Sequence, residues 1–430
     1  MRKSTTQAGV PVIHQTIDDV QVSEALRSSY QQYSEYIARG RALINIDDGF
    51  KSVQRRILYG AYEICRKNNV KSATLDGHVM GHYHPHGMCY GSIVNMVHDG
   101  YLIGKGNWGS TLGVDEISPA ASRYTEVRLN PLSELLFLND LLPYVDWVDS
   151  DTGYKEPKFL PALVPGLLTS LSNTSEFNTA MGVHIKSVYG KSPLVQILDA
   201  VIAYLESGKF PQRIAIQYKN SLVAADCFDK HKFSVVFGAI VEEDRSNVHI
   251  RSTLPNVSYR SLFEDNGISY KDVGTSTTDI VIPKRQYDPD LFTSKVDFSY
   301  MAYHEKDEQT PVTVHAYSLK AACLRLISNM ETILYPRYFE TNINKVSALI
   351  AEYDMLERIR HRLDTEPGLT YKTLSAPEQD VAKKYSVASM MHASERCAEY
   401  RKQLKDLEHR QKNIRGEILA RYKYVRSCLS

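Results

Sequence analysis

The last third of the chain carries a helical repeat of apolar residues, which constrains the fold more than any other pattern in the sequence. Residues 319–363 predict one long helix, broken at Pro336, and residues 377–424 predict a second helical stretch. Pro367 and Gly368 interrupt the pattern between them. Near-heptad spacing in both stretches favours an antiparallel coiled-coil arm. The spaced apolar residues are Val346, Leu349, Tyr353, Leu356 and Leu363 in the first stretch and Leu404, Leu407, Ile414 and Ile418 in the second.

The first 160 residues predict short helices followed by strands. Turn-rich, strand-like sequence runs from Gly104 to Arg128. Helices followed by such a segment favour a winged helix-turn-helix, in which one helix enters the major groove of DNA and a wing reaches the backbone. Residues 1–20 predict an extended arm that precedes the first helix. The predicted helices span residues 22–38, 52–66, 72–80 and 90–98.

The middle of the chain alternates strand-like runs with turns and short helices. Its clearest helix is predicted at residues 194–205. The strand-like runs lie at residues 213–218, 233–241, 248–254, 278–282 and 311–316. The chain is therefore predicted to be a multidomain α+β protein. Its segments are an N-terminal arm (1–20), a winged-helix domain (21–160), an α+β shoulder domain (161–318) and a coiled-coil arm (319–430).

Charge and cysteine usage narrow the class of protein. The net charge of the 430 residues is only +1, so any contact with nucleic acid must come from a local basic patch. The six cysteines are scattered without a C-x-x-C pair, which fits a reducing cytoplasm better than a disulfide or zinc framework. No apolar run is long enough to span a bilayer. A basic patch is predicted from Arg39, Arg41, Lys51, Arg55, Arg56 and Lys67, although these could equally be a solvated helix face.

The pair Arg123-Tyr124 carries the strongest chemical prediction. A phenol ionises near pH 10, so tyrosine is a weak nucleophile unless a neighbouring group stabilises its anion. An arginine is always charged, and its guanidinium can stabilise a phenolate or hold a phosphate through two parallel bonds. Arg128 follows four residues after Tyr124. The pattern suits attack of Tyr124 on a phosphodiester, whereas the simpler interpretation is a surface tyrosine beside a solvated arginine.

Four ordered blocks of the sequence carry a resemblance to a known family. Residues 40–59 resemble G-R-A-L-P…D-G-L-K-P-V-H-R-R-x-L-Y, and residues 71–87 resemble K-S-A-x-x-x-G-x-V-x-G-x-Y-H-P-H-G without a gap. Residues 104–110 resemble G-x-G-N-F-G-S, and residues 123–129 resemble R-Y-T-E-(V/I)-R-L. The chain thus resembles the A subunit of the type IIA DNA topoisomerases, the breakage-reunion core of DNA gyrase and topoisomerase IV. In size it resembles most the medium subunit of T-even-type phage DNA topoisomerase.

The resemblance implies a transient double-strand break in DNA. Tyr124 would be the nucleophile that forms a 5′-phosphotyrosyl link and releases a 3′-hydroxyl, and Arg123 would bind the scissile phosphate. Strand passage would then relax or decatenate DNA. A second chemistry, metal binding at His84-Pro85-His86, lacks an evident third ligand, so phosphate contact or acid/base help is favoured. The predicted DNA contacts are Arg41, Lys51, Arg55, Arg56, His84, His86 and Arg128.

Two departures from the family pattern concern the wedge and the metal. The family inserts an apolar side chain between bases, and the matching position here falls on Thr179, with Phe177 and Met181 as apolar alternatives. Asp149-Ser150-Asp151 resembles a pair of metal ligands, but it falls in a family turn that holds no metal, so we interpret it as a turn. No metal site is predicted in this chain.

The resemblance also implies partners. Mg²⁺ and ATP would be held by a large partner subunit with the ATPase and magnesium-binding domains, and the chain would form a homodimer through its winged-helix region and the C-terminal exit gate. Double-stranded DNA is the predicted substrate, no membrane is involved, and the predicted location is the cytoplasm, of a bacterial host if the chain is phage-encoded. The alternative function is a non-catalytic winged-helix architectural protein. A tyrosine recombinase is disfavoured because Tyr124 lies in the first third of the chain.

Overall fold

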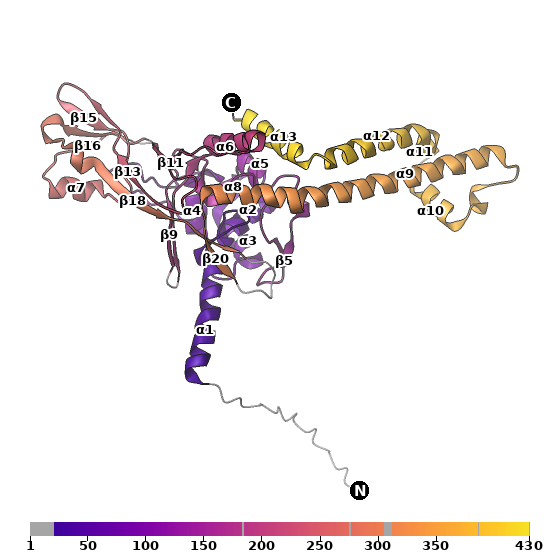
Figure 1. Ribbon diagram of the computed structural model, residues 1–430, viewed down its shortest axis with the longest axis horizontal. Helices are drawn as coiled ribbons and strands as arrows, with labels where there is room; N and C mark the ends of the chain where they lie inside the picture. Colours follow the sequence, from indigo (N-terminus) through magenta and orange to yellow (C-terminus); the bar gives the residue numbers. More distant parts are fainter. Residues whose placement is uncertain (1–20, 183–184, 275–276, 305–311, 386, 430) are drawn as a thin grey trace, which may run out of the picture.

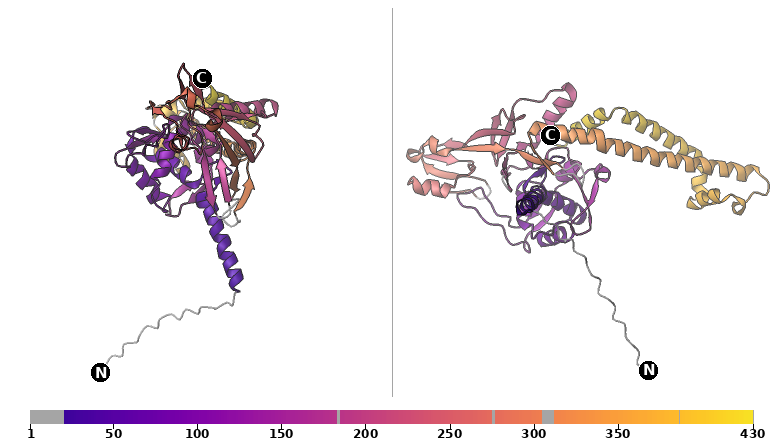
Figure 2. Two further views of the ribbon diagram at one scale, coloured as in Figure 1. Left: turned by 90° about the vertical axis from the view of Figure 1, so that its left-hand side faces the viewer. Right: turned by 60° about the horizontal axis from the view of Figure 1, so that its bottom comes forward.

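The computed structural model describes residues 21–182, 185–274, 277–304, 312–385 and 387–429. The predicted N-terminal arm lies outside these residues. The fold is a mixture of helices and sheets, as predicted. A central body joins a sheet-rich lobe at one end to a long helical arm at the other (Figure 1). Turned views show helix α1 (Val22–Ile37) projecting from this body, separate from both lobe and arm (Figure 2).

The N-terminal segment, residues 21–160, is built mainly of helices around a three-stranded sheet. The strand order is β2-β4-β3, and Gly104 of β3 lies opposite Val127 of β4. The β3–β4 pair occupies the place predicted for a wing. After α1, the elements are the π-helical turn η1 (Ala38–Ala42), α2 (Ser52–Ile64), β2 (Val70–Lys71), α3 (Ser72–His82), α4 (Tyr90–His98), β3 (Leu102–Lys105), β4 (Glu126–Leu129), α5 (Pro131–Phe137), β5 (Trp147–Asp149) and β6 (Lys155–Pro157).

An aromatic cluster lies at the centre of this segment. The ring of Phe50 packs edge-on against Phe137 and Tyr101, with ring centroids 4.9 and 5.6 Å away. The chain returns over this cluster at Gly166, where a Cβ atom would lie 2.7 Å from the Phe50 ring. The Tyr101 hydroxyl donates to the carbonyl oxygen of the same glycine at 2.8 Å. Close packing without a side chain at Gly166 therefore fixes the end of the segment on its core.

The middle of the chain forms several sheets. One has the order β13-β18-β9-β8, and a second, with the order β14-β15-β17-β16, packs with α7 in what we call the outer lobe (residues 239–292). The predicted strands each overlap a strand of the structure. The bounds are β7 (Thr169–Ser170), β8 (Asn178–Gly182), β9 (Ile185–Tyr189), β10 (Ser192–Pro193), α6 (Leu194–Ser207), β11 (Ile214–Tyr218), β12 (Ser221–Ala225), β13 (Lys232–Gly238), β14 (Val241–Glu243), β15 (Asn247–Ile250), α7 (Tyr259–Asp265), β16 (Lys271–Asp272), β17 (Ile280–Pro283) and β18 (Thr293–Ser299).

The last strands tie the middle of the chain back to the N-terminal segment. Strand β1 (Ile44–Asn45) runs parallel to β19 (Met301–His304), and β20 (Thr313–Ala316) pairs with the other edge of β19. The Tyr317 hydroxyl donates to the carbonyl oxygen of Ile46 at 2.8 Å. In the described residues no helix combines the length and apolar character that a membrane crossing requires.

The arm consists of two long helical runs that lie side by side (Figures 1 and 2). The predicted break at Pro336 is wrong. A five-residue π-helical turn, η6 (Met330–Leu334), joins α8 to α9, and Pro336 lies in the first turn of α9, where its missing N–H is tolerated. The second, returning run is divided into several helices. The last of them begins after Asn413, whose side chain accepts a hydrogen bond from Gly416 N. The helices are α8 (Leu319–Asn329), α9 (Tyr335–Thr365), α10 (Ala376–Lys384), α11 (Val387–Met391), α12 (Ala393–Gln411) and α13 (Ile414–Ser427).

The outer half of the arm has a core of its own. Tyr353, Leu356 and Ile359 of α9 pack against helices that follow the turn, and this cluster is distinct from the main core of the molecule. The predicted seam positions Tyr353 and Leu356 are thus buried. The other members of the cluster are Leu374, Ala382, Met390, Ala393 and Cys397.

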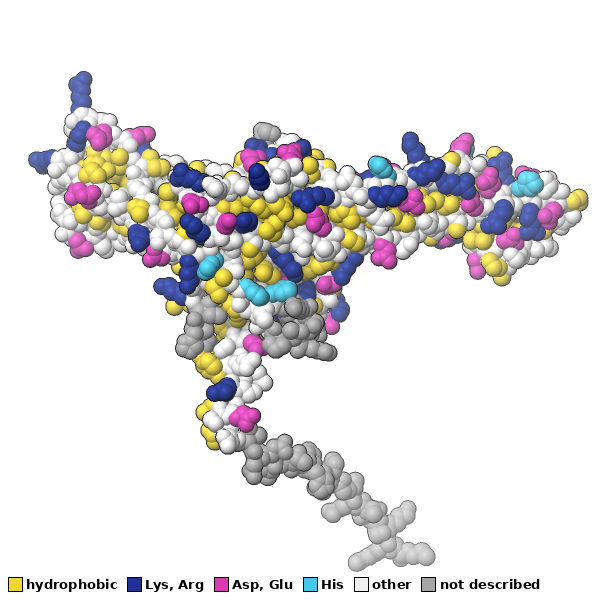
Figure 3. Space-filling view, viewed as in Figure 1, with side chains coloured by type: hydrophobic (Ala, Val, Ile, Leu, Met, Phe, Trp, Pro, Cys, Tyr) yellow, Lys and Arg dark blue, Asp and Glu magenta, His cyan; other side chains and the backbone are white. Residues whose placement is uncertain are grey.

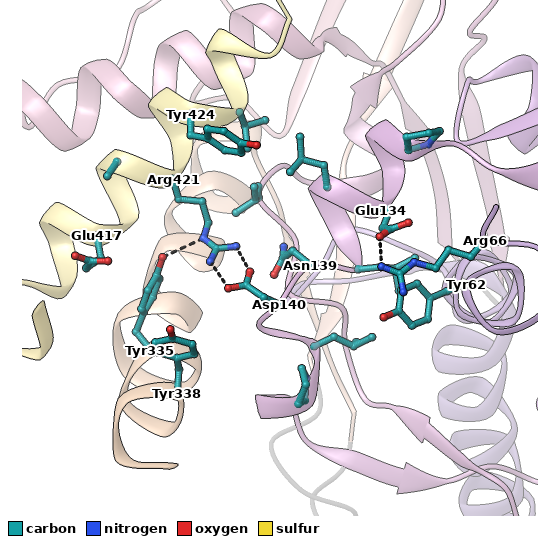
Figure 4. A pocket seen from close by; sticks show the side chains of 18 of the residues that line it. Tyr62, Arg66, Glu134, Asn139, Asp140, Tyr335, Tyr338, Glu417, Arg421 and Tyr424 are labelled. Atoms are coloured by element: carbon teal, nitrogen blue, oxygen red, sulfur yellow. Dashed lines mark hydrogen bonds and ion pairs between the residues drawn. The ribbon is translucent and has the colours of Figure 1, made fainter. Parts of the chain in front are cut away.

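A cavity of about 880 Å³ lies where the arm meets the N-terminal segment (Figure 4). Arg421 of α13 spans one side of it, with two bonds to Asp140 of 2.6 and 3.0 Å and a third to the Tyr335 hydroxyl at 3.0 Å. Arg66 pairs with Glu134 at 2.5 Å on the other side. The base of the arm is therefore joined to the body by side-chain bonds around an open space.

Candidate functional site

Tyr124 lies at the end of a long loop, residues 106–125, that connects β3 to β4. Its side chain is 64% exposed, which leaves the phenol open to a large partner. The Arg123 guanidinium carbon lies over the Tyr124 ring, 4.7 Å from its centroid. The two residues that the sequence predicted to act together are therefore in contact, on a surface and not in a pocket.

The backbone around Tyr124 is fixed to α3 and α4. The N–H of Ser72 donates to the carbonyl oxygen of Thr125 at 3.0 Å, and the N–H of Ala73 donates to that of Ser122 at 3.2 Å. The Tyr90 hydroxyl donates to the carbonyl oxygen of Ala120 at 2.6 Å. Because these bonds lie on both sides of Tyr124, its main chain is held while its side chain stays in solvent.

Two glycines explain the sequence block at residues 104–110. A Cβ atom on Gly104 would lie 2.3 Å from Nε1 of Trp108, so the indole covers the strand at that point. Gly109 has φ +76°, and a Cβ atom there would lie 2.3 Å from the carbonyl oxygen of Ile117. Both positions require glycine for the loop to fold back on β3.

Among the predicted DNA contacts, Arg41, Lys51 and Arg128 retain access to the surface. Arg41 is exposed in η1, and Arg128 is half-buried on β4. Lys51 is half-buried and donates to the carbonyl oxygen of Thr179 at 2.8 Å, which links the start of α2 to strand β8. Burial lowers the pKa of Lys51 to about 8, so it remains mostly protonated at neutral pH.

Two arginines predicted to contact DNA are paired with carboxylates in the free chain. The Arg55 side chain is 8% exposed and binds Asp48 through Nε at 2.6 Å and Nη2 at 3.1 Å. Arg56 makes two bonds to Glu156, at 2.8 and 2.7 Å. Both guanidiniums are held by carboxylates, and the helical spacing of the sequence could not reveal these partners. Arg55 therefore supports the fold, and the guanidinium of Arg56 binds Glu156 of the same chain.

The two histidines of the His-Pro-His block occupy different environments. His84 is buried and its Nδ1 accepts from Nη1 of Arg56 at 3.3 Å, since a guanidinium can only donate. Burial, and then the charge of Arg56, lower the pKa of His84 to about 4. His84 is thus neutral and shielded in the free chain, and its contact with DNA stays a prediction. His86 stays half-buried between the Tyr36 hydroxyl, 3.2 Å from Nδ1, and Asp151, 3.4 Å from Nε2.

Asp149 ends β5, and Asp151 begins the predicted turn that leads to β6. Asp149 pairs with Lys155 across the β5–β6 pair at 2.8 Å, and Asp151 lies between His86 and Arg56. Across the part of the chain that the structure describes, no three His, Cys, Asp or Glu side chains gather as a metal would require. The sequence missed Asp48, Glu156 and Tyr36 as partners, because these pairings join residues from different elements.

The three wedge candidates also differ. Phe177 packs among Tyr218, Phe298 and Phe237, with ring centroids 4.8, 4.9 and 5.6 Å away, so it belongs to the core. Thr179 and Met181 lie on the exposed face of β8, and Met181 is 78% exposed. Of the candidates, only Met181 is therefore both apolar and accessible.

Comparison with known proteins finds a similarity within the first half of this structure. Residues 41–216 match the family model of the DNA gyrase/topoisomerase IV A subunit. This match includes Tyr124, the His-Pro-His block and strand β8. The finding supports the A subunit of a type IIA topoisomerase as the protein that this chain resembles.

Individual relatives agree with that class. The chain is 38% identical over 198 residues to the DNA gyrase A subunit of Thermotoga maritima, which covers 43% of this chain and 23% of the relative. It is 40% identical over 186 residues to the chloroplastic/mitochondrial DNA gyrase A subunit of Arabidopsis thaliana, covering 40% of this chain and 19% of the relative. The matched region therefore spans less than a quarter of the length of these relatives.

Proposed function

We propose that this chain is the DNA-cleaving and rejoining subunit of a type IIA topoisomerase. The observation that carries the proposal is the position of Tyr124, an exposed phenol on a fixed backbone with the Arg123 guanidinium 4.7 Å from its ring centroid. This pair lies inside the segment that matches the A-subunit family model. An exposed nucleophile suits a duplex, because a DNA backbone cannot enter a narrow pocket.

The proposed reaction is a reversible transfer of a phosphodiester. The Tyr124 oxygen attacks the phosphorus and loses its proton, the bond from phosphorus to the 3′ oxygen breaks, and the 3′ oxygen leaves as a hydroxyl after taking up a proton. The 5′ phosphate stays on Tyr124, so attack by the same hydroxyl restores the DNA without an external energy source. Arg123 stabilises the negative charge that builds on the phosphate oxygens. Two copies of the chain would cut the two strands.

Basic, polar and apolar side chains elsewhere in the matched segment support a duplex as substrate. Arg41, Lys51 and Arg128 supply positive charge for phosphates, and His86 offers a further polar contact. Met181, apolar and exposed, would enter a base step and bend the duplex. Mg²⁺ and ATP act, in this proposal, through a partner subunit, and the complex relaxes or decatenates DNA.

The first test replaces Tyr124 by phenylalanine in the full complex with its partner subunit. Tyr124→Phe removes only the nucleophilic oxygen, so covalent protein–DNA links should disappear while DNA affinity is retained. A denaturing gel of end-labelled DNA measures the links. Tyr154→Phe, another exposed tyrosine, is the matched control and should cleave normally.

Two results would count against this function. Wild-type amounts of linked DNA from Tyr124→Phe would exclude Tyr124 as the nucleophile. DNA binding by the wild-type complex with no link under any condition would favour the alternative, a non-catalytic architectural protein.

The second test concerns the wedge. Met181→Ser should reduce the bend that the protein imposes on a short duplex, because the apolar side chain that separates two bases is lost. Energy transfer between dyes at the two DNA ends measures the bend. Met391→Ser, another exposed methionine, on the arm, is the control. An unchanged bend angle in Met181→Ser would remove this residue from the DNA interface.

A further inference from the structure

The loop that carries Tyr124 extends beyond the N-terminal segment and contacts the outer lobe. Residues 111–115, in the middle of this loop, bond to side chains from four places that are distant in the sequence. These side chains are Glu176 before β8, Lys219 in the β11–β12 turn, Arg260 in α7, and Asp272 and Thr278 on either side of residues 275–276. Nothing in the proposed chemistry requires these contacts.

The first contact is a buried ammonium. Lys219 is 4% exposed and donates from Nζ to the carbonyl oxygen of Thr111 at 2.6 Å. Glu176 lies 3.2 Å from the same nitrogen and accepts from the Thr111 hydroxyl at 2.6 Å. Lys219 also has φ +49°, a backbone conformation that a residue with a side chain adopts only under constraint. The β11–β12 turn thus directs a charged group at the loop.

The outer lobe supplies the remaining contacts. The Thr278 hydroxyl donates to the carbonyl oxygen of Leu112 at 2.7 Å. The N–H of Val114 donates to Oδ2 of Asp272 at 2.9 Å. A Cβ atom on Gly113 would lie 2.7 Å from that same carboxylate oxygen, so the loop and the lobe meet without a gap.

A charged pair completes the attachment. Arg260 donates from Nε to Asp115 at 2.7 Å and from Nη2 to the second oxygen of the same carboxylate. Two parallel bonds of this kind fix direction as well as distance. The hydrogen bonds from Arg260 also lower the pKa of Asp115, so the pair is charged at neutral pH.

The attachment is passed along the loop towards Tyr124. Ser110 and Ile117 exchange two backbone hydrogen bonds, of 2.9 and 2.8 Å, which close residues 110–117 into a compact hairpin. The next backbone bond, from Ala120 N to Asn107 O at 3.0 Å, joins this hairpin to the chain that ends at Tyr124. The loop is therefore held at two places, by α3 and α4 near Tyr124 and by the outer lobe at its far end.

We propose that the outer lobe and the β11–β12 turn position Tyr124 for attack, acting through the loop of residues 106–125. Arg260, Asp272 and Lys219 are positioning residues in this arrangement, and none of them touches the DNA bond that breaks. The inference rests on the proposed function of Tyr124. It adds that the rate of cleavage depends on the position of the outer lobe, because displacing the lobe removes one of the two attachments of the loop.

The test uses the full complex and reverses one charge. Arg260→Glu places two carboxylates together and should release the loop, whereas Asp115→Arg combined with Arg260→Glu restores an opposite pair. Arg260 is half exposed, so the fold tolerates the change. Two measurements are made at saturating DNA, hydrogen exchange of residues 106–125 and the rate of covalent linkage. Arg245→Glu, in the β14–β15 turn of the same lobe, is the control for added negative charge.

Arg260→Glu should speed exchange in the loop and slow linkage about fivefold, with DNA affinity unchanged, as loss of an exposed ion pair predicts. The double variant should return both quantities to within about twofold of wild type, and Arg245→Glu should change neither. Unchanged exchange in Arg260→Glu would overturn the attachment. Faster exchange with an unchanged linkage rate would overturn the positioning role and leave the proposed function intact. Absence of linkage in the wild type would instead refute the proposed function, while exchange would still report on the attachment.

Discussion

The N-terminal segment and the arm use charged side chains in opposite ways. In the first, Arg55 and Asp48 form a pair that is almost fully buried, and Arg56 and Glu156 form a second one that is nearly so. On the arm, pairs such as Arg401–Asp354 are largely exposed, and Lys or Arg alternates with Asp or Glu along its surface (Figure 3). Buried pairs tolerate one geometry only, whereas exposed pairs tolerate many. The family match covers the region with the buried pairs and ends before the arm.

The largest effect should come from breaking the buried pair. Asp48→Ala leaves the Arg55 guanidinium buried and uncompensated and also removes the acceptor of Leu160 N, so we expect a loss of about 3–5 kcal/mol in the free energy of unfolding. Both tryptophans of the chain, Trp108 and Trp147, lie in the N-terminal segment, so urea unfolding followed by their fluorescence reports on this segment. A loss below about 1 kcal/mol would erase the difference between the two regions.

A cavity in the arm should have a large effect that stays local. Leu356 is fully buried in the separate core of the outer arm, so Leu356→Ala should cost about 2–5 kcal/mol there. Hydrogen exchange of residues 346–400 should accelerate, while the tryptophan-detected transition stays where it was. A shift of that transition as large as the one from Asp48→Ala would show that the arm and the body unfold as one unit.

Acid should weaken the N-terminal segment through His84. Its pKa in the folded state is about 4, below the ordinary value of 6.5, so between these two pH values only the unfolded state binds the proton. Stability should therefore fall as pH drops from 6.5 to 4, by at most about 1.4 kcal/mol per pH unit from this group. His84→Gln should flatten that part of the profile, and His392→Gln, at an exposed position on the arm, should not. Identical slopes for wild type and His84→Gln would refute the assignment.

The smallest effect belongs to the exposed pair. Arg401→Ala removes the partner of Asp354 at 2.9 Å, but both side chains remain hydrated, so we expect a loss of about 0–1 kcal/mol. Hydrogen exchange across the arm measures it, at low salt and again at about 0.5 M salt, which screens exposed charges. A loss near that of Asp48→Ala would show that exposed and buried pairs contribute alike in this protein.

The sequence predicted elements and motif positions better than side-chain environments. Helix α4 was predicted with its observed bounds, because its apolar spacing is local information. The environments of Arg55 and His84 were not predicted. Arg55 is paired with Asp48, and His84 contacts Arg56, which is bound to Glu156. Such tertiary pairings leave no periodic pattern in the sequence. In the sequence, Phe177 is an apolar residue beside β8 with no evident partner. Its burial depends on Phe298, which lies on a strand more than a hundred residues later.

Pro336 illustrates a different limit. The local rule that proline breaks a helix is correct for a helix interior. Here the preceding π-helical turn places the proline in the first turn of α9, where its missing N–H costs no backbone hydrogen bond. The attachment of the loop to the outer lobe was likewise beyond the sequence. Lys219, Arg260 and Asp272 are ordinary charged residues in it, and only the fold brings them to residues 111–115.

The π-helical turn at the start of α9 also has a mechanical consequence. Helix α9 has 31 residues, so its far end lies about 46 Å from the turn. A rotation of about 10° there would carry the tip of this lever through roughly 8 Å, given that length. The open space around Arg421 lies beside the pivot, whereas Leu334 and Tyr335 are buried in the main core, so such a swing would repack that side of the base. A small rotation at the turn would thus be amplified at the far end of α9.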